Sequence, residues 1–377
     1  MTPDKTTIVA MKHALELAGR GRGMVSPNPL VGCVLTDSTG TIIGEGWHQK
    51  YGEAHAEVNA LNDCIARGNT PAGATAYVTL EPCSHYGKTP PCADLLISSR
   101  IAKCMIAMRD PFHEVNGEGI NKLNAAGIEV EVGLLEQEAK EVNKFFIKHV
   151  TTGLPYLTMK MALSLDGKVA LRNGASKYIT SEASRKVVHQ LRAEYDTVLV
   201  ASATVIADDP ELTVRLVKGR SPKRIILDAS LRVSANSKVY SDDHRASTMV
   251  VANEGVLKDK QSKVNELQSS GIRIIPIPSK TEQLDLKLVF TELGNLGINS
   301  ILIEPGPTLA TTLLQSELLD ELVLFYAPTV LGDDARSAFG ELHLRSLTDA
   351  GRFRLTDCNA VEESNDFCVT LKLSGPR

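Results

Sequence analysis

The segment His55-Ala56-Glu57 and two downstream cysteines, Cys83 and Cys92, constrain this chain of 377 residues more than any other feature. A neutral imidazole and two thiolates are zinc ligands, and three protein ligands leave one tetrahedral position open for water, as in catalytic zinc sites. Glu57 is not needed as a ligand, so its carboxylate is free to carry protons. The fold must therefore bring these separate segments together around one ion.

The order of these residues is that of the zinc nucleobase deaminases, in which a His-x-Glu segment precedes a Pro-Cys segment. The commonest signature has two residues between the cysteines, whereas this chain has eight. Pro82 and a strand-like run over residues 75–80 lead into Cys83, which favours a catalytic zinc site. Two alternatives stay open, namely buried thiols without metal and a structural zinc site with His85 as the fourth ligand.

Composition narrows the classes of protein that this chain can belong to. The formal net charge is −4 and aromatic residues make up 5% of the chain, which speaks against a nucleic-acid-binding protein. The seven cysteines are odd in number and scattered, so we expect a reducing, cytoplasmic location. The N-terminus has no apolar signal core, and no run approaches the roughly 18 apolar residues of a membrane helix.

Strands alternate with helices in the first half of the chain, and this pattern predicts an α/β/α sandwich. Cys33, Cys64 and Cys104 sit in apolar runs and are expected in the core. The glycine-rich segment 19–23 follows a helix instead of a strand, so we interpret it as a loop and not as a dinucleotide-binding turn. The first predicted helix begins at Thr6 or Thr7 and ends at Gly19. The other predicted helices span 55–67, 91–99, 117–126 and 135–149, and the predicted strands span 30–36, 41–47, 75–80, 103–108 and 128–132.

The segment 151–155, Thr-Thr-Gly-Leu-Pro, interrupts this pattern and is the predicted domain boundary. We therefore expect one domain over residues 1–150 and another over 151–377, with a second α/β sheet in the latter. Ser181 is expected to cap a helix, and residues 204–210 are expected to form a polar loop after a strand. The predicted strands of this half span 156–163, 197–201, 224–227, 248–251 and 272–275.

A buried strand is predicted to end at Glu304, where Gly306 and Pro307 turn the chain and Thr308 caps a helix. A helix N-terminus after a glycine turn offers free backbone N–H groups and a positive dipole end to a phosphate. An ordinary strand-to-helix connection is the alternative interpretation.

Two arginines of the second half, Arg192 and Arg215, could bind phosphate through their guanidinium forks, although solvated surface arginines are commoner. Asp208 and Asp209 precede Pro210 and could equally be turn formers.

Taken together, these motifs give the chain a specific resemblance, over almost its whole length, to the bifunctional deaminase/reductase family of bacterial riboflavin biosynthesis. In this family the wide spacing between the cysteines is the usual one. The motifs that carry the resemblance are Asn28-Pro29-Leu30-Val31-Gly32, His55-Ala56-Glu57, Glu81-Pro82-Cys83 with Thr89-Pro90-Pro91-Cys92, Met161-Ala162-Leu163-Ser164-Leu165-Asp166-Gly167, Ala203-Thr204-Val205 with Asp208-Asp209-Pro210, Leu212-Thr213-Val214-Arg215, and Glu304 with Gly306-Pro307-Thr308.

The resemblance implies a cytidine-deaminase-like α/β/α sandwich followed by a dihydrofolate-reductase-like α/β domain. It implies one zinc ion per chain, NADPH as the second cofactor, and two consecutive reactions. The first would hydrolyse the 2-amino group of 2,5-diamino-6-(5-phosphoribosylamino)pyrimidin-4-one, and the second would reduce the ribosyl group, giving 5-amino-6-(5-phosphoribitylamino)uracil.

The resemblance also implies roles for individual residues. Tyr178 stands where related chains often carry tryptophan, and Ala229 stands where serine is expected, which removes a hydroxyl contact to the cofactor. The implied zinc ligands are His55, Cys83 and Cys92, the general acid and base is Glu57, the substrate-binding residues are Asn28, His48, Lys160, Ser176, Arg192, Leu212, Arg215 and Glu304, and the cofactor-binding residues are Ala162, Tyr178, Thr204, Asp208, Ala229, Gly306, Pro307 and Thr308.

Three other functions are alternatives to the two-step enzyme. They are a single-activity zinc deaminase with a catalytically silent C-terminal domain, a nucleic-acid editing or binding module, and a purely structural zinc protein. The expected partner is a small phosphoribosyl pyrimidine, without nucleic acid or membrane, and we expect the chain to self-associate as a dimer or tetramer.

Overall fold

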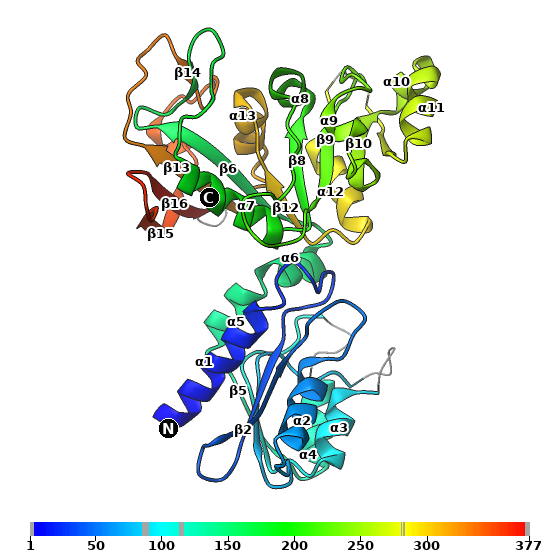
Figure 1. Ribbon diagram of the computed structural model, residues 1–377, viewed down its shortest axis with the longest axis vertical. Coiled ribbons are helices and arrows are strands. Elements are labelled where there is room, and N and C mark those ends of the chain that lie inside the picture. Colours follow the sequence, from blue (N-terminus) through cyan, green and yellow to red (C-terminus); the bar gives the residue numbers. More distant parts are fainter. Residues whose placement is uncertain (1–3, 85–89, 113–116, 280, 282, 374–377) are drawn as a thin grey trace. The chain divides into compact units, whose positions relative to one another are not determined.

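The computed structural model describes residues 4–84, 90–112, 117–279, 281 and 283–373. The chain forms two compact units, Met1–Leu154 and Pro155–Arg377 (Figure 1). This division falls inside the segment 151–155 that interrupts the sequence pattern. Among the described residues, no helix has the length and apolar character needed to cross a membrane.

The N-terminal unit is built on a five-stranded mixed sheet with the strand order β2-β1-β3-β4-β5. Strands β2, β1 and β3 pair antiparallel, whereas β3, β4 and β5 pair parallel. The strands are β1 (Gly32–Thr36), β2 (Ile42–Trp47), β3 (Thr75–Val78), β4 (Lys103–Ile106) and β5 (Glu129–Val132). The helices are α1 (Lys5–Gly19), α2 (Ala56–Ala66), α3 (Cys92–Ser98), α4 (Glu118–Ala125), α5 (Glu136–Val142) and α6 (Lys144–Thr152).

Side chains that alternate along the strands supply a separate core on each face of this sheet. Tyr77 packs with residues of α1 and α5, whereas its neighbours Ala76 and Val78 pack with residues of α2, α3 and α4. Two helical layers thus enclose the sheet, which confirms the predicted α/β/α sandwich. Cys33, Cys64 and Cys104 are fully buried in the second core, as predicted.

Two details of the helices differ from the sequence-based expectation. Helix α1 is capped by Asp4, whose carboxylate accepts hydrogen bonds from the N–H groups of Thr6 and Thr7 at 2.6 and 3.0 Å, so the prediction of a threonine cap was wrong. The single helix predicted over 135–149 is two helices that break at Asn143. The Asn143 amide bonds both the N–H and the C=O of Leu30, at 2.8 and 2.9 Å, which fixes the break against a distant loop.

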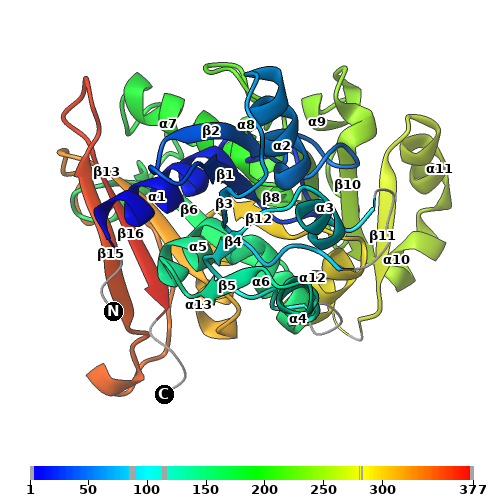
Figure 2. The same ribbon diagram turned by 90° about the horizontal axis from the view of Figure 1, so that it is seen from below.

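The C-terminal unit contains a nine-stranded sheet with the order β11-β10-β9-β8-β12-β6-β13-β16-β15. Its pairings are parallel from β11 to β13, and β16 and β15 add antiparallel at the other edge (Figure 2). The strands are β6 (Tyr156–Ser164), β8 (Thr197–Ala201), β9 (Lys223–Leu227), β10 (Thr248–Asn253), β11 (Arg273–Ile277), β12 (Ser300–Ile303), β13 (Glu321–Ala327), β15 (Phe353–Ala360) and β16 (Phe367–Leu373), and a separate pair is formed by β7 (Lys168–Ala170) and β14 (Arg336–Ser337).

Helices cover both faces of this second sheet, so the unit is of the predicted α/β class. Figure 2 shows α8 and α9 on one side of the sheet and α12 and α13 on the other. Val198 and Val200 of β8 pack with residues of α8, α9 and α11, and Phe290 of α12 is fully buried. The helices are α7 (Glu182–Glu194), α8 (Ser202–Asp208), α9 (Lys238–Ser241), α10 (Glu254–Asp259), α11 (Gln261–Ser269), α12 (Leu286–Asn295) and α13 (Pro307–Ser316).

Two local predictions for this unit were wrong. The expected loop over 204–210 is mostly the helix α8, which ends where Asp209 adopts a left-handed conformation with φ of 41°. Helix α13 is capped by Gly306, with Pro307 in its first turn, so Thr308 lies inside the helix and does not cap it. The proline ring preorganises the first helical residue and loses no hydrogen bond there. Ser181, by contrast, caps α7 as predicted, accepting the Ser184 N–H at 3.2 Å.

Candidate active sites

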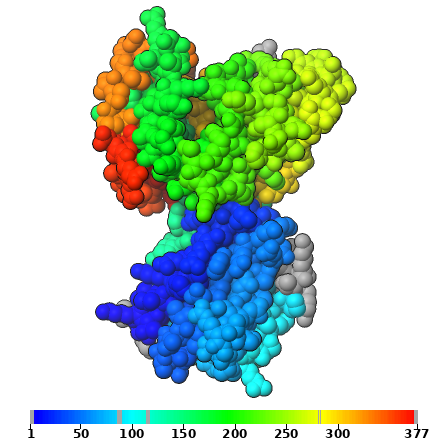
Figure 3. Space-filling model, viewed as in Figure 1, coloured from blue at the N-terminus to red at the C-terminus, as the bar shows by residue number. Residues whose placement is uncertain are grey.

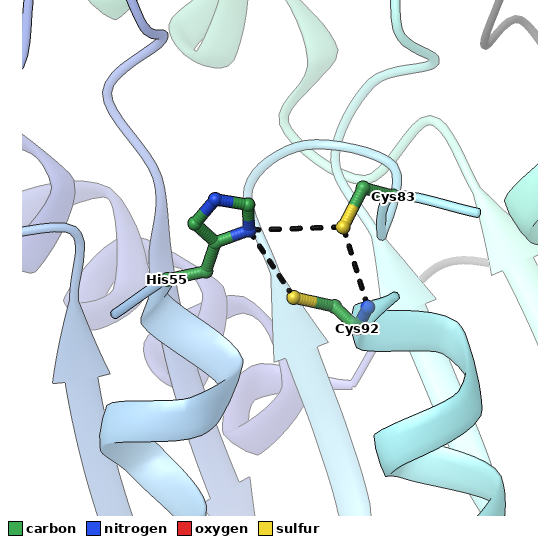
Figure 4. Close-up of side chains that lie close together, drawn as sticks. All are labelled: His55, Cys83 and Cys92. Atoms are coloured by element: carbon green, nitrogen blue, oxygen red, sulfur yellow. Dashed lines mark hydrogen bonds between the residues drawn. The ribbon is translucent and has the colours of Figure 1, made fainter. Parts of the chain in front are cut away.

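The imidazole of His55 and the thiols of Cys83 and Cys92 meet at the ends of three elements of the N-terminal unit (Figure 4). His55 is the N-cap of α2, Cys83 follows β3, and Cys92 begins α3. His55 Nδ1 lies 3.7 Å from Cys83 Sγ and 3.3 Å from Cys92 Sγ. Zinc–ligand bonds of about 2.3 Å to sulfur and 2.0 Å to nitrogen would place tetrahedral ligands about 3.5 Å apart. The cluster therefore has the size of a zinc site.

The charges of this cluster also suit a cation. The pKa of Cys83 is lowered to about 4 by hydrogen bonds from Cys92 and His55, so this thiol is already disposed to ionise. Cys92 is the partner that keeps its proton, since the bond to Cys83 and burial raise its pKa. The backbone N–H of Cys92 also donates to Cys83 Sγ at 3.3 Å, which stabilises the thiolate. His85, the candidate fourth ligand of a structural site, lies outside the described residues.

Glu57 stands beside the cluster in the first turn of α2 and is only 3% exposed. Burial, together with the charge of Cys83, raises the pKa of Glu57 to about 7. A carboxyl group that is half ionised near neutral pH can both accept and donate a proton, which is what a shuttle between water and an amine requires.

The cluster opens into a cavity of about 470 Å³ within the N-terminal unit. His48 Nδ1 lies 3.0 Å from the Ala54 carbonyl, so this nitrogen carries the proton, and Nε2 accepts from the Asn28 amide at 3.2 Å. Burial lowers the pKa of His48, which favours this neutral form. The cavity is lined by Asn28, Pro29, Val31, His48, Tyr51, Gly52, Glu53, His55, Glu57, Leu80, Glu81, Cys83, Asp110, Phe112, Phe146 and Val150.

Glu81 supports this site, although it is not among the predicted site residues. Its carboxylate is 3% exposed and accepts backbone N–H groups from Asp110, Gly117, Gly119 and Ile120 at 3.0–3.3 Å. These bonds fasten the start of α4 to the strand end that leads into the first cysteine. The only available signal was its place two residues before that ligand, because its partners lie far along the chain.

A second polar site forms in the C-terminal unit, where α7 faces the carboxyl end of β12. The guanidinium of Arg192 binds Glu304 through two hydrogen bonds, from Nε at 2.7 Å and from Nη2 at 2.9 Å. Although burial alone would raise the pKa of Glu304, the Arg192 charge lowers it to about 2. Lys160 of β6 lies near this pair, and burial lowers its pKa. Three of the predicted substrate-binding residues are thus brought together.

Arg192 also donates to the Thr213 carbonyl at 3.2 Å, which ties the pair to the segment of Leu212 and Arg215. The guanidinium of Arg215 donates to Thr213 Oγ1 at 2.7 Å, and its backbone N–H donates to His189 Nδ1 at 2.9 Å. Leu212 is buried, with a φ of 56°.

His189 is a residue that sequence reasoning missed, because a histidine inside a helical pattern carries no signal of its own. Burial and the charges of Arg192 and Arg215 lower its pKa to about 4. The ring therefore stays neutral and its Nδ1 remains free to accept the N–H of Arg215.

Some of the residues that are expected to bind the cofactor lie close together. A Cβ placed on Gly306 would lie 3.7 Å from Thr204 Oγ1, so α8 and the N-terminus of α13 line the same space. Free N–H groups at the start of α13 and the adjacent glycine fit a phosphate of a dinucleotide. Two further residues of this group are exposed, namely Thr308 in the first turn of α13 and Asp208 at the end of α8.

The other predicted residues lie on several separate segments of this unit. Ser176 and Tyr178 belong to the segment between β7 and α7, and Tyr178 is 71% exposed with the Arg185 guanidinium 4.2 Å from its ring centroid. Ala162 lies in β6, and Ala229 follows β9, where its carbonyl accepts the Asn253 N–H at 3.0 Å. In the described part of the chain, Ser176 and Asp208 make no side-chain hydrogen bond or ion pair.

The Arg192–Glu304 pair predicts a pH dependence of stability. The pKa of Glu304 is about 2 in the folded chain against 4.5 as its ordinary value, so its ionised form stabilises the fold above pH 4.5. This contribution is about 3 kcal/mol at pH 7 and declines as pH falls from 4.5 toward 2, to roughly 1 kcal/mol at pH 3. Denaturant unfolding at pH 7 and at pH 3 measures the free energy of unfolding of the wild type and of Glu304→Gln. The difference between the two proteins should be smaller at pH 3 than at pH 7. A difference that is larger at pH 3 than at pH 7 would contradict the stabilising role of the Arg192–Glu304 ion pair.

The sandwich fold, the His/Cys/Cys cluster and the buried glutamate define the N-terminal unit as a zinc-binding deaminase domain of the cytidine deaminase class. Residues 4–108 match the cytidine and deoxycytidylate deaminase zinc-binding region, and residues 155–369 match the RibD C-terminal domain. The chain belongs to the RibD family of riboflavin biosynthesis proteins, in which a deaminase domain and a reductase domain are joined.

Similar proteins cover nearly the whole chain. The riboflavin biosynthesis protein RibD of Escherichia coli (strain K12) is 42% identical over 374 residues, which is 96% of this chain and 98% of the relative. A solved structure of Acinetobacter baumannii RibD has a TM-score of 0.88 at 38% identity and covers 98% of this chain and 99% of that one. A Thermotoga maritima diaminohydroxyphosphoribosylaminopyrimidine deaminase/5-amino-6-(5-phosphoribosylamino)uracil reductase has a TM-score of 0.85 at 33% identity, with the same coverage. The predicted family and fold are thereby confirmed.

Proposed function

We propose that this chain catalyses two consecutive steps of riboflavin biosynthesis. The first is the hydrolytic deamination of 2,5-diamino-6-(5-phosphoribosylamino)pyrimidin-4-one, and the second is the NADPH-dependent reduction of the ribosyl group to ribityl. The observation that carries this proposal is the meeting of His55, Cys83 and Cys92 beside the buried Glu57, in a chain whose second unit holds a separate buried polar site.

In the deaminase unit, His55, Cys83 and Cys92 would hold one zinc ion. A bound zinc ion would lower the pKa of a coordinated water toward neutrality. Glu57 removes a proton from the attacking water and gives it to a ring nitrogen of the pyrimidine. It then moves the remaining hydroxyl proton to the departing amine, so ammonia leaves and a carbonyl replaces the amine. Asn28 and His48 line the cavity and orient the pyrimidine. The hydrogen bond between their side chains fixes which polar atoms of the two residues face the bound pyrimidine.

In the reductase unit, NADPH would supply a hydride to the opened sugar. The protein mainly positions the two partners. Arg192 and Glu304 hold each other in place, and with Lys160, Ser176, Leu212 and Arg215 they would contact the phosphoribosyl part of the substrate. The cofactor would lie along Ala162, Tyr178, Thr204, Asp208, Ala229 and the turn 306–308.

We further propose that residues 1–150 carry out the deamination and residues 151–377 the reduction. A cytoplasmic location and self-association as a dimer or tetramer stay predictions, and light scattering of the purified chain tests the latter.

Mass spectrometry of the products tests the function directly. The zinc-loaded protein, given the diaminopyrimidine without NADPH, should accumulate a product in which a carbonyl oxygen replaces the amine. Addition of NADPH should convert this product into a species that carries an additional pair of hydrogens, with loss of NADPH absorbance. A chain that deaminates but never oxidises NADPH would instead support the single-activity deaminase, and a chain that releases no ammonia would overturn the proposal.

A further inference from the structure

Helix α7 holds the segment 213–215 through two side chains that lie three residues apart. Nδ1 of His189 accepts the backbone N–H of Arg215 at 2.9 Å, and the guanidinium of Arg192 donates to the Thr213 carbonyl at 3.2 Å. Residues three apart lie on the same face of a helix, so this acceptor and this donor bind the same stretch of chain. The backbone from which the Arg215 side chain departs is therefore fixed.

The hydrogen bond to the Arg215 N–H also decides the state of the His189 ring. Because Nδ1 accepts, it carries no proton, and the proton of the neutral ring is on Nε2. The residue is 6% exposed, and burial and the charges of Arg192 and Arg215 lower its pKa to about 4. A protonated ring would donate from both nitrogens and could not accept this N–H.

Few side chains could replace the neutral imidazole at this position. The charges that act on the ring are those of three arginines, Arg185, Arg192 and Arg215, and of one carboxylate, Glu304. A lysine or arginine has no acceptor, whereas an aspartate or glutamate would accept the N–H but would offset the positive charge. A neutral acceptor holds the segment and leaves the charge of the arginines available to an anion.

The Arg215 guanidinium has donors to offer to such an anion. The side chain is 47% exposed, and its Nη1 donates to Thr213 Oγ1 at 2.7 Å and pairs with Glu211 at 2.9 Å. Within the part of the chain that the structure describes, its Nε and Nη2 have no hydrogen-bond partner. A guanidinium edge of this kind binds phosphate through two parallel hydrogen bonds.

We propose that His189 is a positioning residue of the reductase site, which holds the Arg215 backbone so that the guanidinium meets the substrate phosphate. The neutral ring does this without adding a negative charge beside the phosphate. This assignment rests on the proposed function, in which Arg215 contacts the phosphoribosyl part of the substrate.

Steady-state NADPH oxidation by the full-length protein, with the deaminated intermediate as substrate, tests the proposal. His189→Leu leaves the Arg215 N–H without its acceptor, so KM for the intermediate should rise about 5- to 100-fold. The turnover number at saturation should change less than about twofold, because the lost interaction acts on substrate binding. The Kd of NADPH, measured by calorimetry, and the rate of deamination in the other unit should stay as in the wild type.

Two further variants separate positioning from a purely structural role. In His189→Asn the side-chain oxygen takes the place of Nδ1, so KM should return to within about threefold of the wild type. His189→Asp also accepts the N–H but places a negative charge near the phosphate, so KM should rise about tenfold or more. A purely structural hydrogen bond predicts the same KM for both variants. The control is His244→Asn, since His244 is an exposed histidine between α9 and β10, and KM should not change.

The possible results separate the assignment of His189 from the proposed function. If His189→Leu keeps the wild-type KM, or if His189→Asp and His189→Asn have equal KM values, the assignment is overturned and the reductase function is untouched. If the wild type does not oxidise NADPH with the intermediate, the proposed reduction fails and the assignment fails with it. Thermal unfolding reports whether each variant is folded, and if His189→Leu is unfolded, the comparison of His189→Asn with His189→Asp decides.

Discussion

Replacement of Glu57 by glutamine is expected to lower the deaminase turnover number about 10²- to 10⁴-fold, the usual contribution of a positioned general acid and base. Glutamine has nearly the same shape but cannot accept and return a proton. Because Glu57 is buried and lies next to the ligand cluster without being needed as a ligand, the variant should bind zinc as the wild type does. Ammonia release under saturating substrate measures the loss.

The same variant carries its own control. The reductase site lies in a different unit of the chain, so Glu57→Gln should oxidise NADPH at the wild-type rate when it is supplied with the deaminated intermediate. Metal analysis of the purified variant should still find one zinc ion per chain. Retention of more than a tenth of the deaminase turnover, at full zinc content, would show that another group moves the proton.

The ligand cluster was predictable because its parts belong to recognisable local patterns. A histidine before a helical run and a proline before a cysteine both mark helix starts, and the structure places His55 at the N-cap of α2 and Cys92 at the first residue of α3. The three ligand atoms then meet because the elements that carry them pack against one sheet. Spacing along the chain, combined with periodicity, was enough to identify this group.

The supporting residues could not be predicted in this way, because their partners are remote in sequence. Glu81 binds N–H groups 29 to 39 residues away, and Asn143 breaks a helix by bonding a residue 113 positions earlier. His189 has a role only because a loop 26 residues on places the Arg215 N–H against it. The segment 204–210 was likewise predicted as a polar loop, whereas residues 204–208 belong to α8. Tertiary contacts decide these features, and no local pattern records them.

Removal of the Asp242 carboxylate is expected to destabilise the C-terminal unit by about 3–5 kcal/mol, because it leaves a buried charge without its partner. Arg224 is fully buried, and its guanidinium binds Asp242 through Nη1 at 2.6 Å and Nη2 at 2.8 Å. Its remaining donors go to Thr248 Oγ1 and to the carbonyls of Glu211 and Val239, so the group has no route to water. The test is Asp242→Ala in denaturant unfolding.

The chain offers an internal reference for this measurement. Its single tryptophan, Trp47, lies in β2 of the N-terminal unit, so tryptophan fluorescence follows that unit while far-ultraviolet circular dichroism follows both. In Asp242→Ala the dichroism should show an earlier transition and the fluorescence transition should stay in place. Deaminase activity should persist at denaturant concentrations at which NADPH oxidation is already lost.

A double variant distinguishes the cost of an unpaired charge from the value of the pair itself. Arg224→Met combined with Asp242→Leu removes both charges and keeps apolar volume, so it should recover most of the stability that Asp242→Ala loses. If the double variant is as unstable as the single one, the hydrogen bonds of Arg224 to the Glu211 and Val239 carbonyls carry the stability instead. That result would assign Arg224 to holding the segment that leads to Leu212 and Arg215 in the C-terminal unit, whose surface Figure 3 shows.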